Sequence, residues 1–128
     1  MTDVHYLLAS TVLTWVMLVV APMIRNREWT RDGLRIGFGN REVLPEATPL
    51  AARADRAARN MLENMVLFVA AFAAAHAAGK VEVTGAAIFF FARLAYWLVY
   101  LAGIPYLRTA LWAVGLVGIG MVGMRAIG

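Results

Sequence analysis

RADRAARNMLEN, residues Arg53–Asn64, is the most informative part of the sequence, because this polar stretch leads without a break into the apolar run Met65–Ala78. The stretch holds five ionisable side chains and two amides. A charged side chain at the centre of a bilayer costs roughly 2.5 to 3.5 kcal/mol on insertion scales, so such residues are usually paired or functional. The apolar run therefore predicts a membrane helix, and the polar stretch predicts a binding site at its head.

The polar residues of this stretch fall on one side of the predicted helix. A helix advances about 100° per residue, which places Arg56, Asn60 and Glu63 on one face, with Arg53 at its edge. The result is a polar stripe that descends from the membrane surface into the bilayer. Such a stripe is suited to a ligand that is itself charged and polar.

The composition indicates an integral membrane protein. Of the 128 residues, 62% are hydrophobic and 16% are charged, whereas a soluble domain averages about half and a quarter. There is no cysteine, so the chain has no thiol of its own, and any sulfur chemistry must come from a ligand. Arginine, which supplies nearly all the positive charge, suits bidentate carboxylate recognition. Basic clusters beside membrane spans usually set topology, so no nucleic-acid partner is expected.

The chain divides into four predicted spans within one all-α domain, residues 1–128. The spans cover about residues 4–24, 53–78, 84–102 and 107–127. The break between the third and fourth is Gly103-Ile104-Pro105, because proline cannot continue a helix. The short turn 79–83 predicts that spans two and three are antiparallel neighbours. The long connection 25–50 is expected to be a solvated link. The predicted fold class is a four-helix transmembrane bundle.

The positive residues predict the orientation of this bundle. Most arginines lie in the connection 25–50, at the head of the second span, or at Arg108. The opposite end carries only Lys80 and Arg125. The positive-inside rule then places both termini outside and the polar stripe open to the cytoplasm.

A second polar stripe lies on the third span. Arg93, Tyr96 and Tyr100 are spaced i, i+3 and i+7, which again is one helical face. One interpretation is a buried ion pair between Arg93 and Glu63 that only closes the bundle. The number of polar groups on the two helices exceeds what one pair needs, which favours a ligand site.

Two further residue types bear on the chemistry. Arg108 is either a snorkelling arginine at the membrane surface or a cation held close to a bound anion such as a thiolate. The two histidines, His5 and His76, are isolated in the sequence, and there is no cysteine. No metal site is therefore expected.

Two motifs resemble one known family. RAARNMLEN, Arg56–Asn64, resembles the R-A-x-x-N-x-x-E signature of MAPEG proteins, the membrane-associated proteins in eicosanoid and glutathione metabolism. The stretch from Ala92 through Tyr100 to Arg108 is similar to the junction of that family's third and fourth helices. The resemblance covers the whole chain in length and in the order of spans.

The resemblance implies a function as well as a fold. It implies a homotrimer that binds glutathione between neighbouring subunits near the cytoplasmic side, with Arg108 stabilising the thiolate of glutathione. It also implies a membrane-bound, glutathione-dependent transferase or peroxidase acting in detoxification, in the inner membrane of a bacterium. The second substrate would be a hydrophobic small molecule or a lipid peroxide arriving through the membrane lipids. The residues that would contact glutathione are Arg53, Arg56, Asn60, Glu63, Arg93, Tyr96 and Tyr100.

Two other functions remain open at this point. A non-catalytic MAPEG-like protein would bind a thiol or a lipid without turnover. A small multidrug-type transporter also has four short helices and a buried glutamate. That class places an isolated glutamate in its first helix, whereas Glu63 lies in the second span among arginines and amides.

Overall fold

The computed structural model describes all residues 1–128 and consists of five helices without strands. The helices are α1 (Asp3–Asn26), α2 (Arg31–Phe38), α3 (Pro49–Ala77), α4 (Val83–Ala102) and α5 (Pro105–Ile127). Four of them, all but α2, are long and apolar enough to cross a membrane. This confirms the predicted all-α class with four membrane helices.

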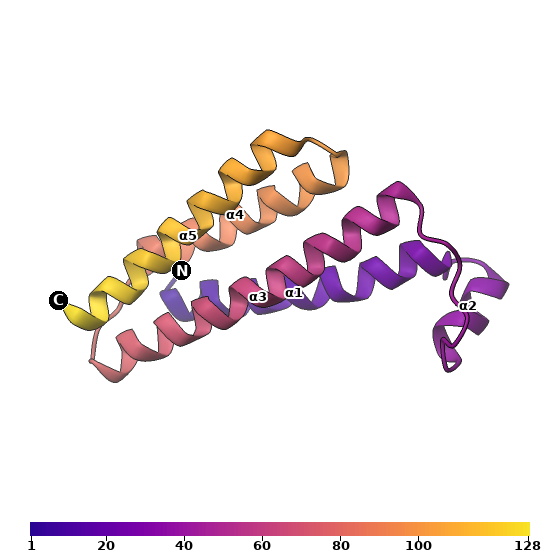
Figure 1. The fold of residues 1–128 in the computed structure, drawn as a ribbon. Coiled ribbons are helices and arrows are strands. Elements are labelled where there is room, and N and C mark those ends of the chain that lie inside the picture. The colour runs from indigo at the N-terminus through magenta and orange to yellow at the C-terminus, as the bar shows by residue number, and fades with distance from the viewer.

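The four long helices form an up-and-down bundle, with each antiparallel to the next one along the chain (Figure 1). Both termini lie at one end, together with the turn between α3 and α4. The other end carries α2, the start of α3 and the turn between α4 and α5. The two termini therefore lie on the same side of the bundle, and the side of the membrane that they face stays a prediction.

The extent of packing between two long helices does not follow their order along the chain. The pair α4 and α5 is the most extensive, and α3 packs mainly against α1 and α5 and less against α4. Two glycines make the α4–α5 approach close. A Cβ on Gly118 would lie 2.7 Å from the carbonyl oxygen of Gly85, and a Cβ on Gly85 would lie 2.8 Å from the carbonyl oxygen of Gly118. Small residues allow such approaches where no hydrophobic force drives helices together.

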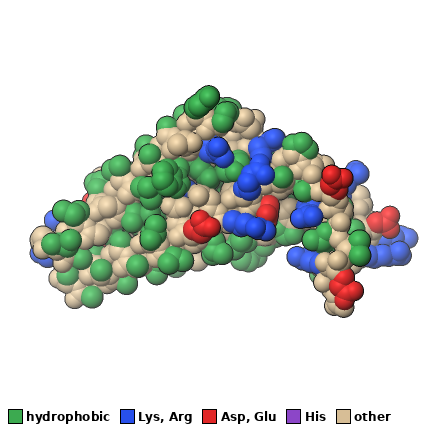
Figure 2. Space-filling view, viewed as in Figure 1, with side chains coloured by type: hydrophobic (Ala, Val, Ile, Leu, Met, Phe, Trp, Pro, Cys, Tyr) green, Lys and Arg blue, Asp and Glu red, His purple; other side chains and the backbone are tan.

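The connection 25–50 was expected to be a solvated link without a helix, but it contains α2. Thr30 begins this helix by accepting a hydrogen bond from the Gly33 backbone N–H through its side chain. Side-chain capping of this kind satisfies an amide that the helix leaves unpaired. Figure 2 shows that basic side chains, which are arginines here, gather toward the α2 end, while hydrophobic side chains cover most of the long helices.

A hydrogen bond and an ion pair close the end of the bundle that carries the termini. Asp3, which is buried, lies 2.7 Å from Nε2 of His76 and so ties the start of α1 to the end of α3. Glu82 caps α4 and accepts a hydrogen bond from Nε of Arg125 at 2.9 Å. This guanidinium, together with the Gly85 backbone N–H, holds the pKa of the Glu82 carboxyl below its ordinary value.

Candidate functional site

The predicted site residues come from three helices, and all but Glu63 lie together toward the end that carries α2. The first turns of α3 supply one set, the second half of α4 another, and the start of α5 the last. In order along the chain they are Arg53, Arg56, Asn60, Glu63, Arg93, Tyr96, Tyr100 and Arg108.

Tyr100 lies between two of the arginines. Nε of Arg56 donates a hydrogen bond to its hydroxyl at 3.1 Å. The guanidinium carbon of Arg108 lies 4.5 Å from the centroid of its ring. Cation–π contacts of this geometry are favourable, more so where water is excluded. The buried Tyr100 therefore contacts Arg56 from α3 through its hydroxyl and Arg108 from α5 through its ring.

Arg53 joins the start of α3 to the end of α4. Its Nη2 donates to the carbonyl oxygen of Leu101 at 3.2 Å, which satisfies an acceptor that the helix end leaves free. Gly103, at φ 80°, then turns the chain in the left-handed conformation that favours glycine. The Nε of Arg53 is buried and has no hydrogen-bond partner. It is therefore a donor available to a bound acceptor.

These three arginines line one cavity of about 190 Å³. The other lining residues are Tyr100, Gly103, Ile104 and Pro105. No carboxylate lines the cavity, so its positive charge is uncompensated within the chain. An anion is the ligand that this charge arrangement favours.

Arg93 takes no direct part in that cavity. It is the largest fully buried side chain, with an exposed fraction of 0%. Its Nη2 donates to Oδ1 of Asn60 at 2.8 Å, and its Nε donates to the sulfur of Met61 at 3.2 Å. Its guanidinium carbon lies 4.0 Å from the ring centroid of Tyr96. Arg93 thus binds protein groups and lines neither of the cavities formed by the other site residues.

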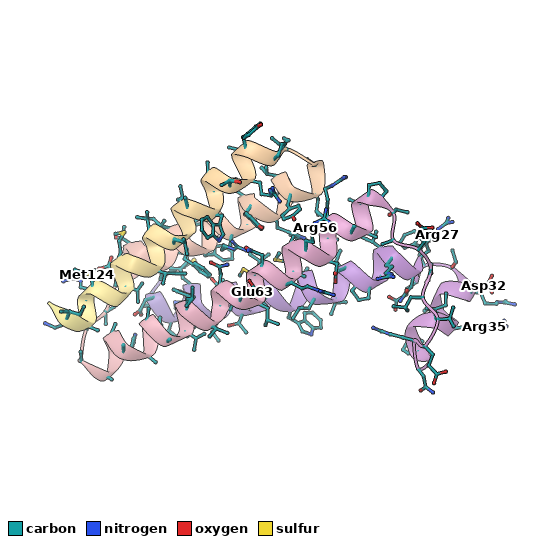
Figure 3. The ribbon with its side chains drawn as sticks, in the orientation of Figure 1. Arg27, Asp32, Arg35, Arg56, Glu63 and Met124 are labelled. Carbon is teal, nitrogen blue, oxygen red and sulfur yellow. The ribbon has the colours of Figure 1, made fainter.

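The interpretation of Arg93 as the ion-pair partner of Glu63 is wrong in this structure. No acidic side chain lies within ion-pair distance of Arg93. Glu63 is exposed and makes no ion pair within the chain, and it lies on the outer side of α3 (Figure 3). The physical reason is the rotation of α3 about its axis, which turns Asn60 and not Glu63 toward α4.

Asn60 is the link between the buried and the open parts of the site. Besides Arg93, its Oδ1 accepts a hydrogen bond from Nδ2 of Asn64 at 3.3 Å. Asn60 also lines a second cavity, of about 240 Å³, together with Tyr96, Arg108, Thr109 and Trp112. Arg108 lines both cavities, and the rings of Tyr96 and Tyr100 lie 5.4 Å apart, edge to face. The structure therefore brings together seven of the eight predicted residues and leaves Glu63 on the outside.

Three lining or supporting residues were not predicted from the sequence. Thr109 and Trp112 line the second cavity, and Met61 accepts a hydrogen bond from Arg93. The spacing of Trp112, four residues after Arg108, is the helical signal that could have identified it. Met61 gave no such signal, because a methionine in an apolar helix is ordinarily a packing residue.

The structure shows no group of three or more histidine, cysteine, aspartate or glutamate side chains able to hold a metal ion. The ionisable residues of the two cavities are arginines and tyrosines, which suit a polar anion.

The fold and the site define an integral membrane protein with four spanning helices and a cation-rich site at one end. The chain belongs to the MAPEG family, whose family model matches residues 4–128, essentially the whole chain. No curated protein and no solved structure matches the chain. The family includes membrane-bound, glutathione-using transferases and peroxidases, and also non-catalytic members. The predicted family is confirmed, and the transporter alternative is set aside.

Proposed function

We propose that this protein is a membrane-bound, glutathione-dependent transferase or peroxidase that activates the glutathione thiol toward hydrophobic electrophiles or lipid peroxides. The observation that carries the proposal is the cavity lined by Arg53, Arg56 and Arg108 without any carboxylate. Glutathione has two carboxylates, one ammonium group and a thiol, so it supplies the anions that such a cavity favours.

Arg108 is the residue to which we assign thiolate stabilisation. A cysteine-type thiol has an unperturbed pKa of about 8.5, and a neighbouring arginine lowers it toward a reactive thiolate. Arg108 lines both cavities, so a thiol held between them lies beside its guanidinium. Arg53 and Arg56 are the groups for the carboxylates, since Arg93 is enclosed by protein.

Glu63 belongs to the proposal as the group for the ammonium of glutathione, with a neighbouring subunit completing the site. An exposed carboxylate on a membrane helix is costly, so a second copy or a ligand is expected to cover it. An apolar groove of about 430 Å³ lies on the same helix, lined by Leu62, Met65, Val66, Val69, Ala70 and Ala73. These features support assembly of several copies, and we propose the homotrimer with glutathione between subunits and a cytoplasmic site that the family resemblance implies.

The test is titration of the detergent-purified protein with glutathione, followed by the ultraviolet absorbance of the thiolate. We expect a saturable thiolate signal in the wild type. Arg108→Ala should abolish this signal, and Glu63→Gln should weaken binding while the thiolate still forms at saturation. Absence of binding at millimolar glutathione would refute the proposal and leave the non-catalytic alternative. A positive result would be followed by assays with a conjugation substrate and with a lipid hydroperoxide, which separate transferase from peroxidase activity.

A further inference from the structure

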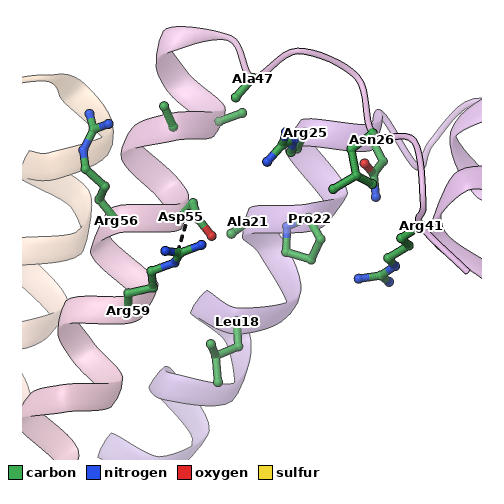
Figure 4. Close-up of a pocket in the computed structure, with 13 residues that line it drawn as sticks. Leu18, Ala21, Pro22, Arg25, Asn26, Arg41, Ala47, Asp55, Arg56 and Arg59 are labelled. Atoms are coloured by element: carbon green, nitrogen blue, oxygen red, sulfur yellow. Dashed lines mark ion pairs between the residues drawn. The ribbon is translucent and has the colours of Figure 1, made fainter.

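The largest charged cavity of the molecule lies on the other side of α3, away from the proposed glutathione site. It has a volume of about 430 Å³ and lies between the end of α1, the connection that follows α2, and the start of α3 (Figure 4). In this view α3 separates it from α4. Arg56 lines both this cavity and the smaller one, and every other residue that lines this cavity is separate from the proposed glutathione site.

Basic side chains dominate the lining. Three arginine side chains and a single acidic one face the cavity, namely Arg25, Arg41, Arg59 and Asp55, whereas the side chain of Arg56 points away from it toward α4 (Figure 4). Asp55 is already paired with Nε of Arg59 at 3.1 Å. Arg25 donates from Nε to the carbonyl oxygen of Pro45 at 3.1 Å, and Arg41 donates from Nε to that of Gly37 at 3.0 Å. Both contacts use only Nε, so the terminal nitrogens remain available to a bound anion.

A buried amide gives a second, independent indication of a ligand. Asn26 lines the cavity, is only 3% exposed, and its Oδ1 is buried without any hydrogen-bond partner. Buried polar groups without partners are rare because they cost stability. An acceptor in this position is satisfied by a ligand that carries a hydroxyl group. The cavity therefore offers guanidinium groups for an anion and an amide oxygen for a hydroxyl.

The rest of the cavity lining is mostly apolar, and exposed apolar side chains follow it along α1. Leu18, Ala21 and Pro22 line its inner side. Leu18 is 40% exposed, and Trp15, one turn further into the span, is 63% exposed. A ligand whose polar group lies among the arginines can therefore extend an apolar chain along α1. The cavity itself lies at the end of a spanning helix, which is the depth of lipid headgroups.

We infer that this cavity binds the headgroup of an anionic phospholipid whose headgroup carries a hydroxyl, with phosphatidylglycerol as the representative chemistry. Arg25 and Arg41 bind the phosphate, Asn26 accepts from the headgroup hydroxyl, and the acyl chains lie along Leu18 and Trp15. The site is separate from glutathione chemistry and does not depend on the proposed function.

The test is native mass spectrometry of the full-length protein in mild detergent, with added phosphatidylglycerol or phosphatidylcholine. We expect the wild type to retain phosphatidylglycerol in preference to phosphatidylcholine. The double variant Arg25→Gln/Arg41→Gln should lose retention by roughly fivefold for each arginine removed, the value of one basic residue at an anionic membrane surface. The matched control is Arg31→Gln/Arg35→Gln, which removes the same charge from exposed positions of α2 outside the cavity.

Asn26→Leu separates binding from folding. Leucine has a similar size and removes the unpartnered amide, so this variant should melt at an unchanged or higher temperature in lipid-free detergent. Its preference for phosphatidylglycerol should nevertheless fall. A purely structural role for Asn26 predicts the opposite pattern, with lower melting temperature and unchanged lipid retention.

Three outcomes would overturn the inference. Equal losses in the cavity variant and the α2 control would mean that only diffuse surface charge attracts the lipid. Displacement of the lipid by glycerol 1-phosphate at equal concentration would identify a soluble phosphate ester as the occupant. A change of oligomeric state in the Arg25→Gln/Arg41→Gln variant, with lipid retention unaltered, would identify the cavity as an interface between copies of the chain.

Discussion

Asn60→Leu should destabilise the protein, because it removes the oxygen acceptor that lies 2.8 Å from Nη2 of Arg93. Arg93 is fully buried, and its other polar contacts are the sulfur of Met61 at 3.2 Å and the ring of Tyr96 at 4.0 Å. Its Nη1 already has no partner. A hydrogen bond to a charged group is worth about 1.5 to 3 kcal/mol, so we expect the free energy of unfolding to fall by about that amount.

The assay is unfolding in mild detergent by titration with a denaturing detergent, followed by tryptophan fluorescence. Asn60→Asp is the matched variant, since it keeps an acceptor at the position now 2.8 Å from Nη2 of Arg93. It should retain most of the wild-type stability by forming an ion pair. The double variant Asn60→Leu/Arg93→Met should be more stable than Asn60→Leu alone, because no buried charge then remains uncompensated.

The reasoning would be refuted if Asn60→Leu unfolded within about 0.5 kcal/mol of the wild type, the range of ordinary surface substitutions. It would also be refuted if Arg93→Met gave no recovery in the Asn60→Leu background. Either result would mean that Arg93 does not depend on Asn60 and that water or another group satisfies it.

Three further predictions concern the helix packing, the end of the bundle and the site. Gly118→Ala should lower the free energy of unfolding by about 1 to 3 kcal/mol, because the added Cβ would lie 2.7 Å from the carbonyl oxygen of Gly85. The control Gly120→Ala should be neutral or stabilising in the same assay, because its added Cβ would meet nothing within 4 Å. The contribution of Glu82 to stability should be complete above its ordinary pKa of about 4.3 and should disappear as the pH falls through its lowered folded-state pKa. The free energy of unfolding of Glu82→Gln should therefore change less over this acid range than that of the wild type. Identical pH dependence in the two proteins would contradict the Arg125 contact. Tyr100→Phe should raise the dissociation constant of glutathione about fivefold to tenfold, because Arg56 loses its hydrogen bond to the Tyr100 hydroxyl. The thiolate signal at saturation should be retained, because the ring that contacts Arg108 remains. Loss of that signal would instead mean that the Tyr100 hydroxyl itself stabilises the thiolate.

Much of the fold follows from the sequence, because helical period and hydrophobicity are local properties. The apolar runs predicted the four long helices, and the 100° step predicted that Arg56 and Asn60 share a face. The helix α2 was missed, since eight residues are too few for a periodic signal to stand out from a polar connection. The family motif, read from the same residues, agrees with the family model that matches residues 4–128.

Helical period alone assigns side chains to helix faces, and it therefore predicts two polar stripes of arginines, amides and tyrosines on α3 and α4. Which members of the two stripes meet depends on how the helices pack. The close approach at Gly85 and Gly118 fixes α4 against α5, and the rotation of α3 then turns Asn60 toward Arg93 and leaves Glu63 outside. Helical period cannot specify this choice, because the rotation of one helix relative to another depends on contacts between residues far apart in the chain.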